Sequence, residues 1–500
     1  MTDLHTYLTF DVGTTAIKTC LFDEKLQVLA QCTDEYDLLT ANGLVELDSD
    51  VYWRTICRAV EKLGKQTSLD GVKTISITTQ GETMIPVDRD GKALCNAIVW
   101  LDGRAEEQAK KILEKYSLRE LYDRTGISDM NGFVPLAKLM WLKEHAQDVY
   151  QTAYKVLLLE DFLIMKLTGK FVTESALQAS TGWYDNHTDR YLENILQTLE
   201  LNADLLPEIL DCGKIVAPIL PDVAQKLGLP ADVQIVSGAM DQTAAAVGGG
   251  GLKDGIITAT IGTALVLTVI VPEDLYLEEP VIYYRGVKAG QFFLLPLCNA
   301  AGIVFKWLKD TTFQKEAEQC KTDGQDIYDY LCNLAKDAPA GANGLTVLPY
   351  FNGSIQPTVL PQAKGVFFGL TLNTSKGELV RAVLEGIAYM FRENIDMLKQ
   401  LGVDIKQIHF FGGGSKNPIW NQIIADVTGV ELVLLEQKEC ASVGAAMLAA
   451  VAIGDYPDLE TAQLQNRIQT VVRPDPDRMR VYEELYQKYL KLFRSVEGLF

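Results

Sequence analysis

Basic residues are scarce in this 500-residue chain. It carries 46 lysines and arginines against 66 aspartates and glutamates, which gives a net charge of −20. Proteins that bind nucleic acid or anionic membranes do so through clusters of lysine and arginine. The charge balance therefore argues against both kinds of partner. An anionic ligand would have to be bound by local hydrogen-bond donors that overcome the acidic surface.

Metal-binding and disulfide patterns are also absent. The nine cysteines include no C-x-x-C pair, and the four histidines form no H-E-x-x-H motif. Scattered cysteines of odd number are typical of buried free thiols in a reducing compartment. The N-terminus lacks the basic region and apolar run of a signal peptide. These features together predict a cytoplasmic protein.

The longest uncharged stretch, residues 255–272, is the one candidate for a membrane span. Its length alone would suit such a span. Threonines, β-branched residues and a central Gly-Thr pair instead favour two strands around a turn. No membrane segment is expected.

The length predicts at least two domains, because single hydrophobic cores stop growing well below 500 residues. Four consecutive glycines at 248–251 indicate a flexible joint and a plausible hinge. We therefore expect one domain over residues 1–248 and a second over residues 249–500.

Local patterns indicate α/β architecture. Residues 74–78, TISIT, alternate like a strand, and Ser49-Asp50 can cap a helix. The apolar stripe of that helix is expected to consist of Trp53, Ile56, Val60 and Leu63. A second helical stripe near the C-terminus consists of Tyr482, Leu485, Tyr486, Tyr489, Leu490 and Phe493. Strands interleaved with amphipathic helices are typical of βαβ units.

The two halves of the chain open in the same way. Residues 9–23 read TFDVGTTAIKTCLFD, and residues 257–271 read ITATIGTALVLTVIV. Both predict a strand, a Gly-Thr turn and a second strand. This weak repeat suggests two related α/β domains around a cleft.

The common nucleotide-binding loops are missing. None of the four Gly-Lys dipeptides continues into serine or threonine, so no P-loop is present. Residues 412–417, GGGSKN, carry asparagine where the dinucleotide fingerprint needs a third glycine. Any phosphate site must therefore be built differently.

The two Gly-Thr turns offer that alternative, since tight turns expose backbone N–H groups and a hydroxyl to phosphate oxygens. Facing each other across a cleft, they would hold the phosphates of ATP from two sides. Each turn alone is more typical of a plain hairpin. Asp11 beside the first turn is expected to hold Mg²⁺ through water. The expected phosphate contacts are Gly13, Thr14, Thr15, Lys18, Gly262 and Thr263.

A third glycine-rich segment lies at residues 407–436. A short strand at 408–411 leads into the turn Gly412–Gly414, and Asn417 with Pro418 predicts the start of a helix that ends at Gly429. Glycines between strand and helix leave a flat surface on which adenine can lie. Tight packing of helix on sheet explains the same residues equally well.

The acceptor side is expected in residues 75–108, where polar side chains stand at strand ends and in loops. Ligands bind at the carboxyl ends of strands in open α/β sheets, and an indole beside hydrogen-bonding groups suits a polyhydroxy compound. For Asp102 and Arg104, a structural ion pair is an equal alternative. The candidate residues are Gln80, Glu82, Trp100, Asp102 and Arg104.

Residues 236–250, VSGAMDQTAAAVGGG, place Asp241 and Gln242 between an apolar strand and a helix of small residues. A carboxylate there is positioned to accept the proton of an acceptor hydroxyl. Capping of the helix is the alternative role, and the two roles can coexist.

The whole chain resembles the FGGY carbohydrate kinases. The segments FVPLAKLMWLKEH (133–145) and GVFFGLTLNTSKGELVRAVLE (365–385) match two long signatures of that family. GGGSKNPIWNQIIADV and GAMDQ match further blocks. The resemblance implies two actin-like ATPase domains of the ribonuclease H-like class, flanking a nucleotide and substrate cleft. It implies that residues 1–248 bind the sugar and carry the first phosphate hairpin, and that residues 249–500 bind the nucleotide. It also implies transfer of the ATP γ-phosphate to a hydroxyl of a sugar or polyol, with Mg²⁺.

Residue by residue, the resemblance implies Asp241 as catalytic base and, with Asp11, as a metal-associated carboxylate. It implies Gly413, Gly414 and Asn417 at the adenosine, and Gly302 and Lys306 along the nucleotide. Gln242 joins the acceptor side, as does Gly81, which with Glu82 stands where the family selects its acceptor.

The acceptor itself is less clearly indicated. Glycerol kinases carry Arg-Glu, and xylulokinases Met-His, where this chain has Gly81-Glu82. The Trp100–Arg104 segment, WLDGR, is closer to the xylulokinase pattern. A pentulose such as xylulose is the first expectation, and a polyol (glycerol, a tetritol or a pentitol) or an aldonate the second. The expected assembly is a homodimer.

An actin-like ATPase chaperone without a small-molecule acceptor is the alternative from another class. The polar residues of the acceptor side, which such a protein does not need, argue against it.

Overall fold

The computed structural model describes residues 5–272, 275, 277–278, 280–288 and 290–500. Their contacts divide the chain into two compact units. Unit 1 comprises Met1–Leu252, Ile270–Leu294 and Glu439–Asn466, and unit 2 comprises Lys253–Val269, Leu295–Lys438 and Arg467–Phe500. The boundary after residue 248 stays a prediction, and the grouping by contacts adds two later segments to unit 1.

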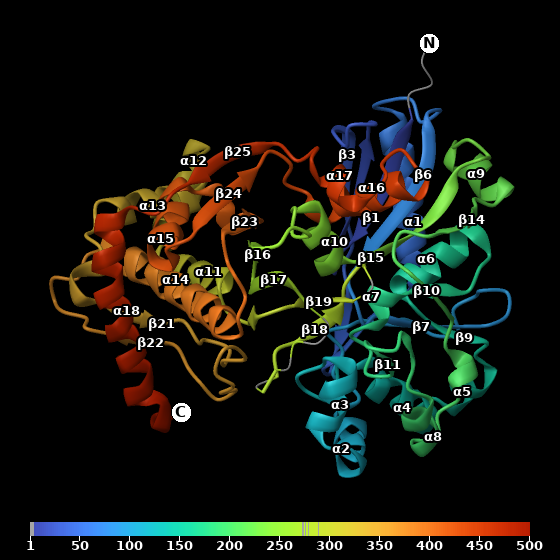
Figure 1. The fold of residues 1–500 in the computed structure, drawn as a ribbon, viewed down its shortest axis with the longest axis horizontal. Helices are drawn as coiled ribbons and strands as arrows, with labels where there is room; N and C mark the ends of the chain where they lie inside the picture. Colours follow the sequence, from blue (N-terminus) through green and yellow to red (C-terminus); the bar gives the residue numbers. More distant parts are fainter. Residues whose placement is uncertain (1–4, 273–274, 276, 279, 289) are drawn as a thin grey trace. The chain divides into compact units, whose positions relative to one another are not determined.

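Unit 1 contains a six-stranded mixed sheet with the strand order β14-β15-β6-β1-β2-β3 (Figure 1). β1 is antiparallel to β2 and parallel to β6, and β6 is parallel to β15. The strands are β1 (Thr6–Val12), β2 (Ala16–Phe22), β3 (Val28–Glu35), β6 (Val72–Thr79), β14 (Ile215–Pro218) and β15 (Gln234–Met240). The predicted hairpin at residues 9–23 and the strand at 74–78 are confirmed.

The parallel register of this sheet positions the candidate residues. Val12 pairs with Thr79, and Thr79 pairs with Met240, so β1, β6 and β15 end side by side. The segments that follow these three strands are the Gly13 turn, Gln80–Glu82 and Asp241. Their common position at one sheet edge explains why three distant stretches of sequence belong together.

Helix α1 (Ser49–Gly64) covers part of this sheet and contacts β2 and β3. Its N-cap is Asp48, whose side chain accepts from the N–H of Asp50, rather than the predicted Ser49-Asp50 pair. Trp53, expected in the buried stripe, is only partly buried, and Tyr52 takes the core position instead. Ile56, Val60 and Leu63 are buried as predicted, so only the first position of the stripe is wrong.

One of the glycines expected to form a flexible joint, Gly248, has a packing role. α10 (Asp241–Gly248) lies against α16 (Cys440–Ala452) in unit 1. A Cβ on Gly248 would lie 2.0 Å from the carbonyl oxygen of Cys440, and one on Gly444 would lie 1.9 Å from that of Ala244. Only glycine permits such close helix contact. A hinge at this segment stays a prediction.

A second sheet in unit 1 runs in the order β4-β5-β8-β7-β9. Its strands are β4 (Leu39–Ala41), β5 (Leu44–Leu47), β7 (Met84–Val87), β8 (Ala97–Ile98) and β9 (Lys155–Leu158). The helices of unit 1 not yet given are α2 (Glu106–Lys115), α3 (Leu118–Thr125), α4 (Pro135–His145), α5 (Gln147–Thr152), α6 (Leu159–Thr168), α7 (Ser175–Gln178), α8 (Glu193–Thr198), α9 (Pro221–Leu227) and α17 (Leu459–Gln463). Two-stranded sheets are formed by β10 (Val172–Glu174) with β13 (Glu208–Leu210) and by β11 (Tyr184–Asp185) with β12 (Arg190–Tyr191). β18 (Tyr283–Arg285) is antiparallel to β19 (Gln291–Leu294).

Unit 2 repeats the arrangement of strands seen in unit 1. β16 (Ile256–Ile261) is antiparallel to β17 (Leu265–Pro272) and parallel to β23 (Gln407–Phe411), which is parallel to β24 (Glu431–Leu435). β25 (Ile468–Val472) completes this side of the sheet. The hairpin of β16 and β17 corresponds to that of β1 and β2, so the internal repeat predicted from the sequence is confirmed.

Helices of unit 2 begin and end at recognisable signals. Asn417 caps α15 (Pro418–Thr428) through the N–H of Ile419, and Gly429 ends it in the left-handed conformation, as predicted. The other helices are α11 (Gly302–Thr312), α12 (Gln314–Asp323), α13 (Ile327–Lys336), α14 (Lys376–Gln400) and α18 (Pro476–Val496). The remaining strands are β20 (Leu297–Cys298), β21 (Thr346–Leu348) and β22 (Val366–Phe368). Four of the predicted stripe residues on α18 are buried: Tyr482, Tyr486, Tyr489 and Phe493.

A buried carboxyl joins α14 to α18. Glu393 accepts hydrogen bonds from the hydroxyls of Tyr350 (2.7 Å) and Tyr489 (2.8 Å). Burial raises the pKa of Glu393 to about 7, although both phenols oppose the shift. The folded state therefore holds this proton more tightly than the unfolded state does.

This shift predicts a pH dependence of stability. Because the pKa of Glu393 is raised in the folded state, its contribution to the free energy of unfolding is present at about pH 4 and is lost as the pH rises to about 7. Glu393→Gln removes the titration, so its melting temperature relative to the wild type should increase between pH 5 and pH 8. Thermal unfolding at both pH values measures the difference. A difference that is the same at both would contradict the assignment.

No helix among the described residues is both long and apolar enough to cross a membrane.

Candidate active site

Three carboxylates gather at the edge of the unit 1 sheet where β1, β6 and β15 end. Asp11 lies one residue before the end of β1, Glu82 follows β6, and Asp241 opens α10. All three are partly buried. Their charges act on one another, because Asp11 and Glu82 both raise the pKa of Asp241. The structure thus brings together a predicted metal-associated residue, a predicted acceptor residue and the predicted base.

Asp241 has the properties of a general base near neutral pH. Burial, followed by the charge of Asp11, raises its pKa to about 7. Its Oδ1 accepts from the N–H of Gln242 at 2.7 Å, which holds the side chain in place. Asp241 is the first residue of the helix rather than its cap, which is Met240. A base whose pKa lies near the working pH transfers protons most efficiently.

Asp11 is paired in register with Lys18 across the first hairpin. Burial raises the pKa of Asp11 to about 6, while the Lys18 ammonium lowers it. Lys18 itself donates to the carboxylate of Glu439, a contact that the sequence did not predict. Part of its charge is therefore already compensated, which weakens its expected role beside phosphate.

Glu82 is held in an unusual backbone conformation, with φ at +58°. Such an angle is uncommon for a residue other than glycine, and strain of this kind often marks a functional position. Burial raises the pKa of Glu82, while Ser180 and Lys138 oppose the rise. Its neighbour Gly81 is buried, and a Cβ there would lie 3.1 Å from Met240 Sδ. Gly81 therefore provides room for packing beside the carboxylate.

Lys138 was missed by sequence reasoning although it lies within the quoted segment 133–145. Its side chain is completely buried, and its ammonium donates to the carbonyl oxygens of Val99 (3.0 Å) and Trp100 (3.2 Å). Burial lowers its pKa to about 8, while Glu82 counteracts this effect. A lysine inside an apolar helical run was the signal that could have revealed it.

Trp100 joins the acceptor side to the first phosphate turn. Its indole N–H donates to the hydroxyl of Thr14 at 3.0 Å. Gly13 and Thr15 of the same turn are held by backbone hydrogen bonds, from Gly13 to Ala16 and from Tyr36 to Thr15. Two sites predicted from separate stretches of sequence are thus in direct contact.

Asp102 and Arg104 form the ion pair that the sequence left open as an alternative. Asp102 is fully buried, and the guanidinium of Arg104 donates to both of its oxygens at 2.7 Å. Burial alone would raise the pKa of Asp102, but the bonds from Arg104 and Val45 lower it. Arg104 also donates to Glu46 at 2.6 Å. These contacts favour a structural role for the pair, which supports the loop that carries Trp100.

Gln80 is also buried, and its N–H donates to the carbonyl of Val12, tying the end of β6 to that of β1. Its side-chain Nε2 donates to the hydroxyl of Tyr52 at 3.4 Å. Gln242 is partly buried. The roles of both residues toward an acceptor stay predictions.

In unit 2, the predicted nucleotide residues converge at the end of β16. Gly262 and Thr263 are exposed in the turn after this strand. A Cβ on Gly302 would lie 2.0 Å from the carbonyl oxygen of Gly262, and Ile303 N–H donates to the carbonyl of Thr263. The N-terminus of α11 thus packs directly on the second Gly-Thr turn.

The glycines after β23 meet the same strand end. A Cβ on Gly414 would lie 2.7 Å from Cβ of Ile261, so close packing requires glycine there. Gly413 is exposed and accessible to a ligand. Asn417 is occupied by its capping bond and by a 2.8 Å bond to Asp329, and Lys306 donates to Asp310 at 2.6 Å.

The opposition of the two Gly-Thr turns across a cleft concerns both units and stays a prediction.

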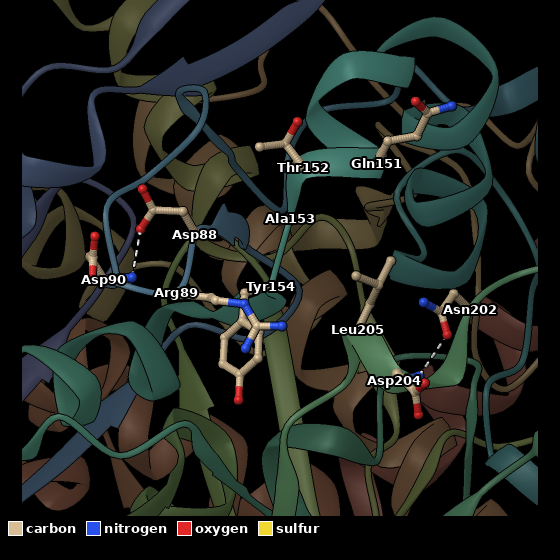
Figure 2. Close-up of a pocket in the computed structure, with 10 residues that line it drawn as sticks. All are labelled: Asp88, Arg89, Asp90, Gln151, Thr152, Ala153, Tyr154, Asn202, Asp204 and Leu205. Atoms are coloured by element: carbon tan, nitrogen blue, oxygen red, sulfur yellow. Dashed lines mark hydrogen bonds between the residues drawn. The ribbon is translucent and has the colours of Figure 1, made fainter.

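A hollow in unit 1 contains none of the predicted residues. It measures about 550 Å³ and is lined by Asp88, Arg89, Asp90, Gln151, Thr152, Ala153, Tyr154, Asn202, Asp204 and Leu205 (Figure 2). Its polar groups are largely occupied: Asp88 and Asn202 accept from backbone N–H groups of their own turns, and Arg89 lies over the Tyr154 ring. The carboxylate edge remains the candidate site.

Both units thus contain a Gly-Thr hairpin within a mixed sheet. In unit 1, the carboxylate of Asp241 also has a pKa that suits a general base. These features define an enzyme with two domains of the actin-like ATPase fold.

Comparisons with known proteins agree. The N-terminal domain of the FGGY family of carbohydrate kinases matches residues 6–248, and the C-terminal domain of that family matches residues 257–453. A xylulose kinase from Escherichia coli is 28% identical over 493 residues, 98% of this chain and 99% of that protein.

Solved structures give the same result. A gluconate kinase from Lactobacillus acidophilus superposes with a TM-score of 0.89 at 27% identity, covering 99% of this chain and 98% of that one. A ligand-bound xylulose kinase from the same organism gives 0.88 at 27% identity with the same coverage. The chain belongs to the FGGY family of carbohydrate kinases. It is an ATP-dependent sugar kinase, and the chaperone alternative is not retained.

Proposed function

We propose that this kinase phosphorylates a neutral ketopentose such as xylulose, with Asp241 as the base. The supporting observation is the charge of the candidate site. Asp11, Glu82 and Asp241 are three neighbouring carboxylates, and the charges of Asp11 and Glu82 both raise the pKa of Asp241, so further negative charge at this site is unfavourable. A sugar without a carboxylate meets no such repulsion.

The cations of the same region are already engaged. Lys18 is paired with Glu439, and Arg104 with Asp102 and Glu46. Lys138 donates to two backbone carbonyls. An aldonate would need a free cation for its carboxylate, so this arrangement favours a ketose over gluconate. Hydroxyl groups can instead donate to the carboxylates.

In the proposed reaction, the acceptor hydroxyl donates a hydrogen bond to Asp241 and loses its proton to that carboxylate. The acceptor oxygen then forms a bond to the γ-phosphorus as the bond to the β,γ-bridging oxygen of ATP breaks. ADP and the sugar phosphate are released. Positioning and charge stabilisation lower the barrier to such a transfer, and little covalent chemistry falls to the protein. Gly13, Thr14 and Thr15 are proposed to bind phosphate oxygens.

We propose Mg²⁺ as the cofactor, held by Asp11 and Asp241. No group of three or more metal-ligating side chains occurs among the described residues. Two carboxylates still suit this ion, because Mg²⁺ retains several waters and is bound by one or two carboxylates together with substrate phosphates. When bound, the ion neutralises charge on the phosphates.

The nucleotide contacts in unit 2 belong to the same proposal. Gly262, Thr263 and Gly413 are exposed and accessible, so they are proposed to contact the nucleotide directly. Gly302 and Gly414 support them by close packing.

A screen of ADP release over ketopentoses, ketohexoses, aldonates, pentitols, tetritols and glycerol tests the acceptor. Saturation by a ketopentose at sub-millimolar concentration supports the proposal. Turnover with an aldonate or a polyol, together with no ADP release for any ketose, contradicts the proposed acceptor. The assignment as a kinase would still stand.

We also propose a homodimer in the cytoplasm. Three large apolar side chains are exposed close together along the chain of unit 2, with exposed fractions of 59% for Phe368, 56% for Leu370 and 105% for Leu372. They lie on or after β22, which pairs with β21 in a two-stranded sheet. Exposed apolar patches at a strand edge favour association. No disulfide joins cysteines among the described residues, which is consistent with the cytoplasm.

Light scattering after size exclusion tests the dimer. Leu372→Asp should convert it to a monomer, whereas the same substitution at exposed Leu464 of unit 1 should not. A wild-type monomer would overturn the proposal.

A further inference from the structure

We propose that Glu174 is a positioning residue that fixes the catalytic base by holding the backbone immediately before it. The inference rests on the proposed role of Asp241. Glu174 lies at the end of β10 and is completely buried. Its Oε1 accepts from the N–H of Met240 at 3.1 Å. Met240 is the cap of α10 and directly precedes Asp241.

The end of β15 needs such support because it contains a bulge. Its register with β6 shifts between Val236 and Ala239. Within the bulge, a Cβ on Gly238 would lie 1.5 Å from the carbonyl oxygen of Ile77, so the two strands approach closely there. A bulge interrupts the ladder and leaves backbone groups without their usual partners. Buried groups of this kind must be satisfied in another way.

Side chains from other elements supply those partners one residue at a time. Glu160 Oε1 accepts from the N–H of Gly238 at 2.9 Å, and the hydroxyl of Thr78 donates to the carbonyl of Ala239 at 2.7 Å. Glu174 completes the series at Met240. Three consecutive residues before Asp241 are thus held by buried side chains.

Glu174 is suited to this task as a carboxylate. Besides Met240, it accepts from the N–H groups of Ala176 and Leu177, both at 2.5 Å, and from the thiol of Cys212 at 2.9 Å. Four donors therefore converge on its two oxygens. Burial raises the pKa of Glu174 to about 7, while the bonds from Cys212 and the backbone lower it. Without its proton the carboxylate accepts from all four donors, whereas an amide brings an N–H₂ group into contact with donors.

The consequence for catalysis follows from the short connection. Any displacement of the Met240 backbone moves the first residue of α10, which carries the base. Misplacement of a reacting group by about 1 Å can reduce the rate by about 10². The residue acts on turnover through Asp241 and not through binding of either substrate.

The test is Glu174→Gln in the full-length enzyme. We expect kcat to fall at least about 10-fold, with KM for ATP and for the ketose changed by less than about 2-fold. The matched control is Asp161→Asn. Asp161 is equally buried and belongs to the same region, but its carboxylate accepts from the N–H of Leu158, whereas that of Glu174 accepts from the N–H of Met240 in β15. Its kcat should stay within about 2-fold of the wild type. A Glu174→Gln enzyme with wild-type kcat overturns the proposal.

A double-mutant cycle separates positioning from a general structural role. If Glu174 acts through Asp241, Glu174→Gln should have little further effect on the residual rate of Asp241→Asn. An undiminished effect in that background overturns the positioning role. Near-normal activity of Asp241→Asn alone overturns the proposed base instead, so the two failures are distinguishable.

A second pair of variants addresses the backbone itself. Met240→Pro removes the N–H that donates a hydrogen bond to Glu174. The backbone should tolerate this change, because the φ of Met240, −48°, is close to that of proline. Met240→Leu changes the side chain but keeps the N–H. We expect a fall in kcat of at least about 10-fold for proline relative to leucine. Equal kcat values for the two variants overturn the proposal, even if Glu174→Gln does not fold.

Discussion

Replacement of Asp241 by asparagine should lower kcat by a factor of roughly 10² or more while ATP still binds. The asparagine side chain has nearly the same shape but cannot accept the proton of the acceptor hydroxyl. The bond from the N–H of Gln242 can be retained by the amide oxygen, so the geometry of the helix start should persist. Initial rates of ADP release at saturating substrates measure kcat, and titration calorimetry measures ATP affinity.

Asp161→Asn is a suitable control for this experiment because it makes the same chemical change at a buried position. Burial raises the pKa of Asp161 to about 8, so the wild-type side chain is already largely neutral at pH 7. Its replacement should therefore leave kcat nearly unchanged. Turnover of Asp241→Asn close to that of the wild type would show that another group takes the proton.

Glu82→Gln should lower kcat/KM for the ketopentose by roughly 10- to 100-fold. Hydrogen bonds to charged groups contribute about 1.5–3 kcal/mol, and the substitution weakens one that the proposed acceptor makes. It also removes one of three neighbouring negative charges, so the preference for a ketose over an aldonate should decrease. Competition between the two substrates in one assay measures that preference directly.

The strained backbone at Glu82 requires a second variant. Glu82→Gly tolerates a φ of +58° without strain but also lacks the carboxylate. If the carboxylate is what matters, the glycine variant should be no more active than the glutamine variant, although it is free of strain. A glycine variant with wild-type kcat/KM would rule out a direct contact between Glu82 and the acceptor.

Local patterns predicted much of the fold. The two hairpins were readable because apolar alternation surrounds a Gly-Thr turn. The start of α15 was readable because Asn417 and Pro418 are both typical of a helix N-terminus. The buried face of α1 was predicted at Ile56, Val60 and Leu63 but not at its first position. Tyr52 and Trp53 are both large and aromatic, and only tertiary packing determines which of them is buried.

The candidate site was predictable where one motif carries the chemistry. Asp11 and Asp241 each stand directly beside a recognisable turn or strand end. Lys138 and Glu174 were not predicted, because their roles depend on partners far away in sequence. Lys138 donates to Val99 and Trp100, 39 and 38 residues away, and Glu174 reaches Met240 across 66 residues. Patterns in the local sequence do not predict contacts between residues that lie so far apart in the chain.

The left-handed backbone at Glu82 has a consequence for anyone who wishes to redesign the acceptor. Glycine, asparagine, aspartate and histidine adopt positive φ more readily than other residues, and β-branched residues adopt it least. A library at this position is therefore best restricted to those four, which explore different hydrogen-bonding chemistry without added backbone strain. Valine, isoleucine and threonine would confound any change in substrate preference with a loss of folded enzyme.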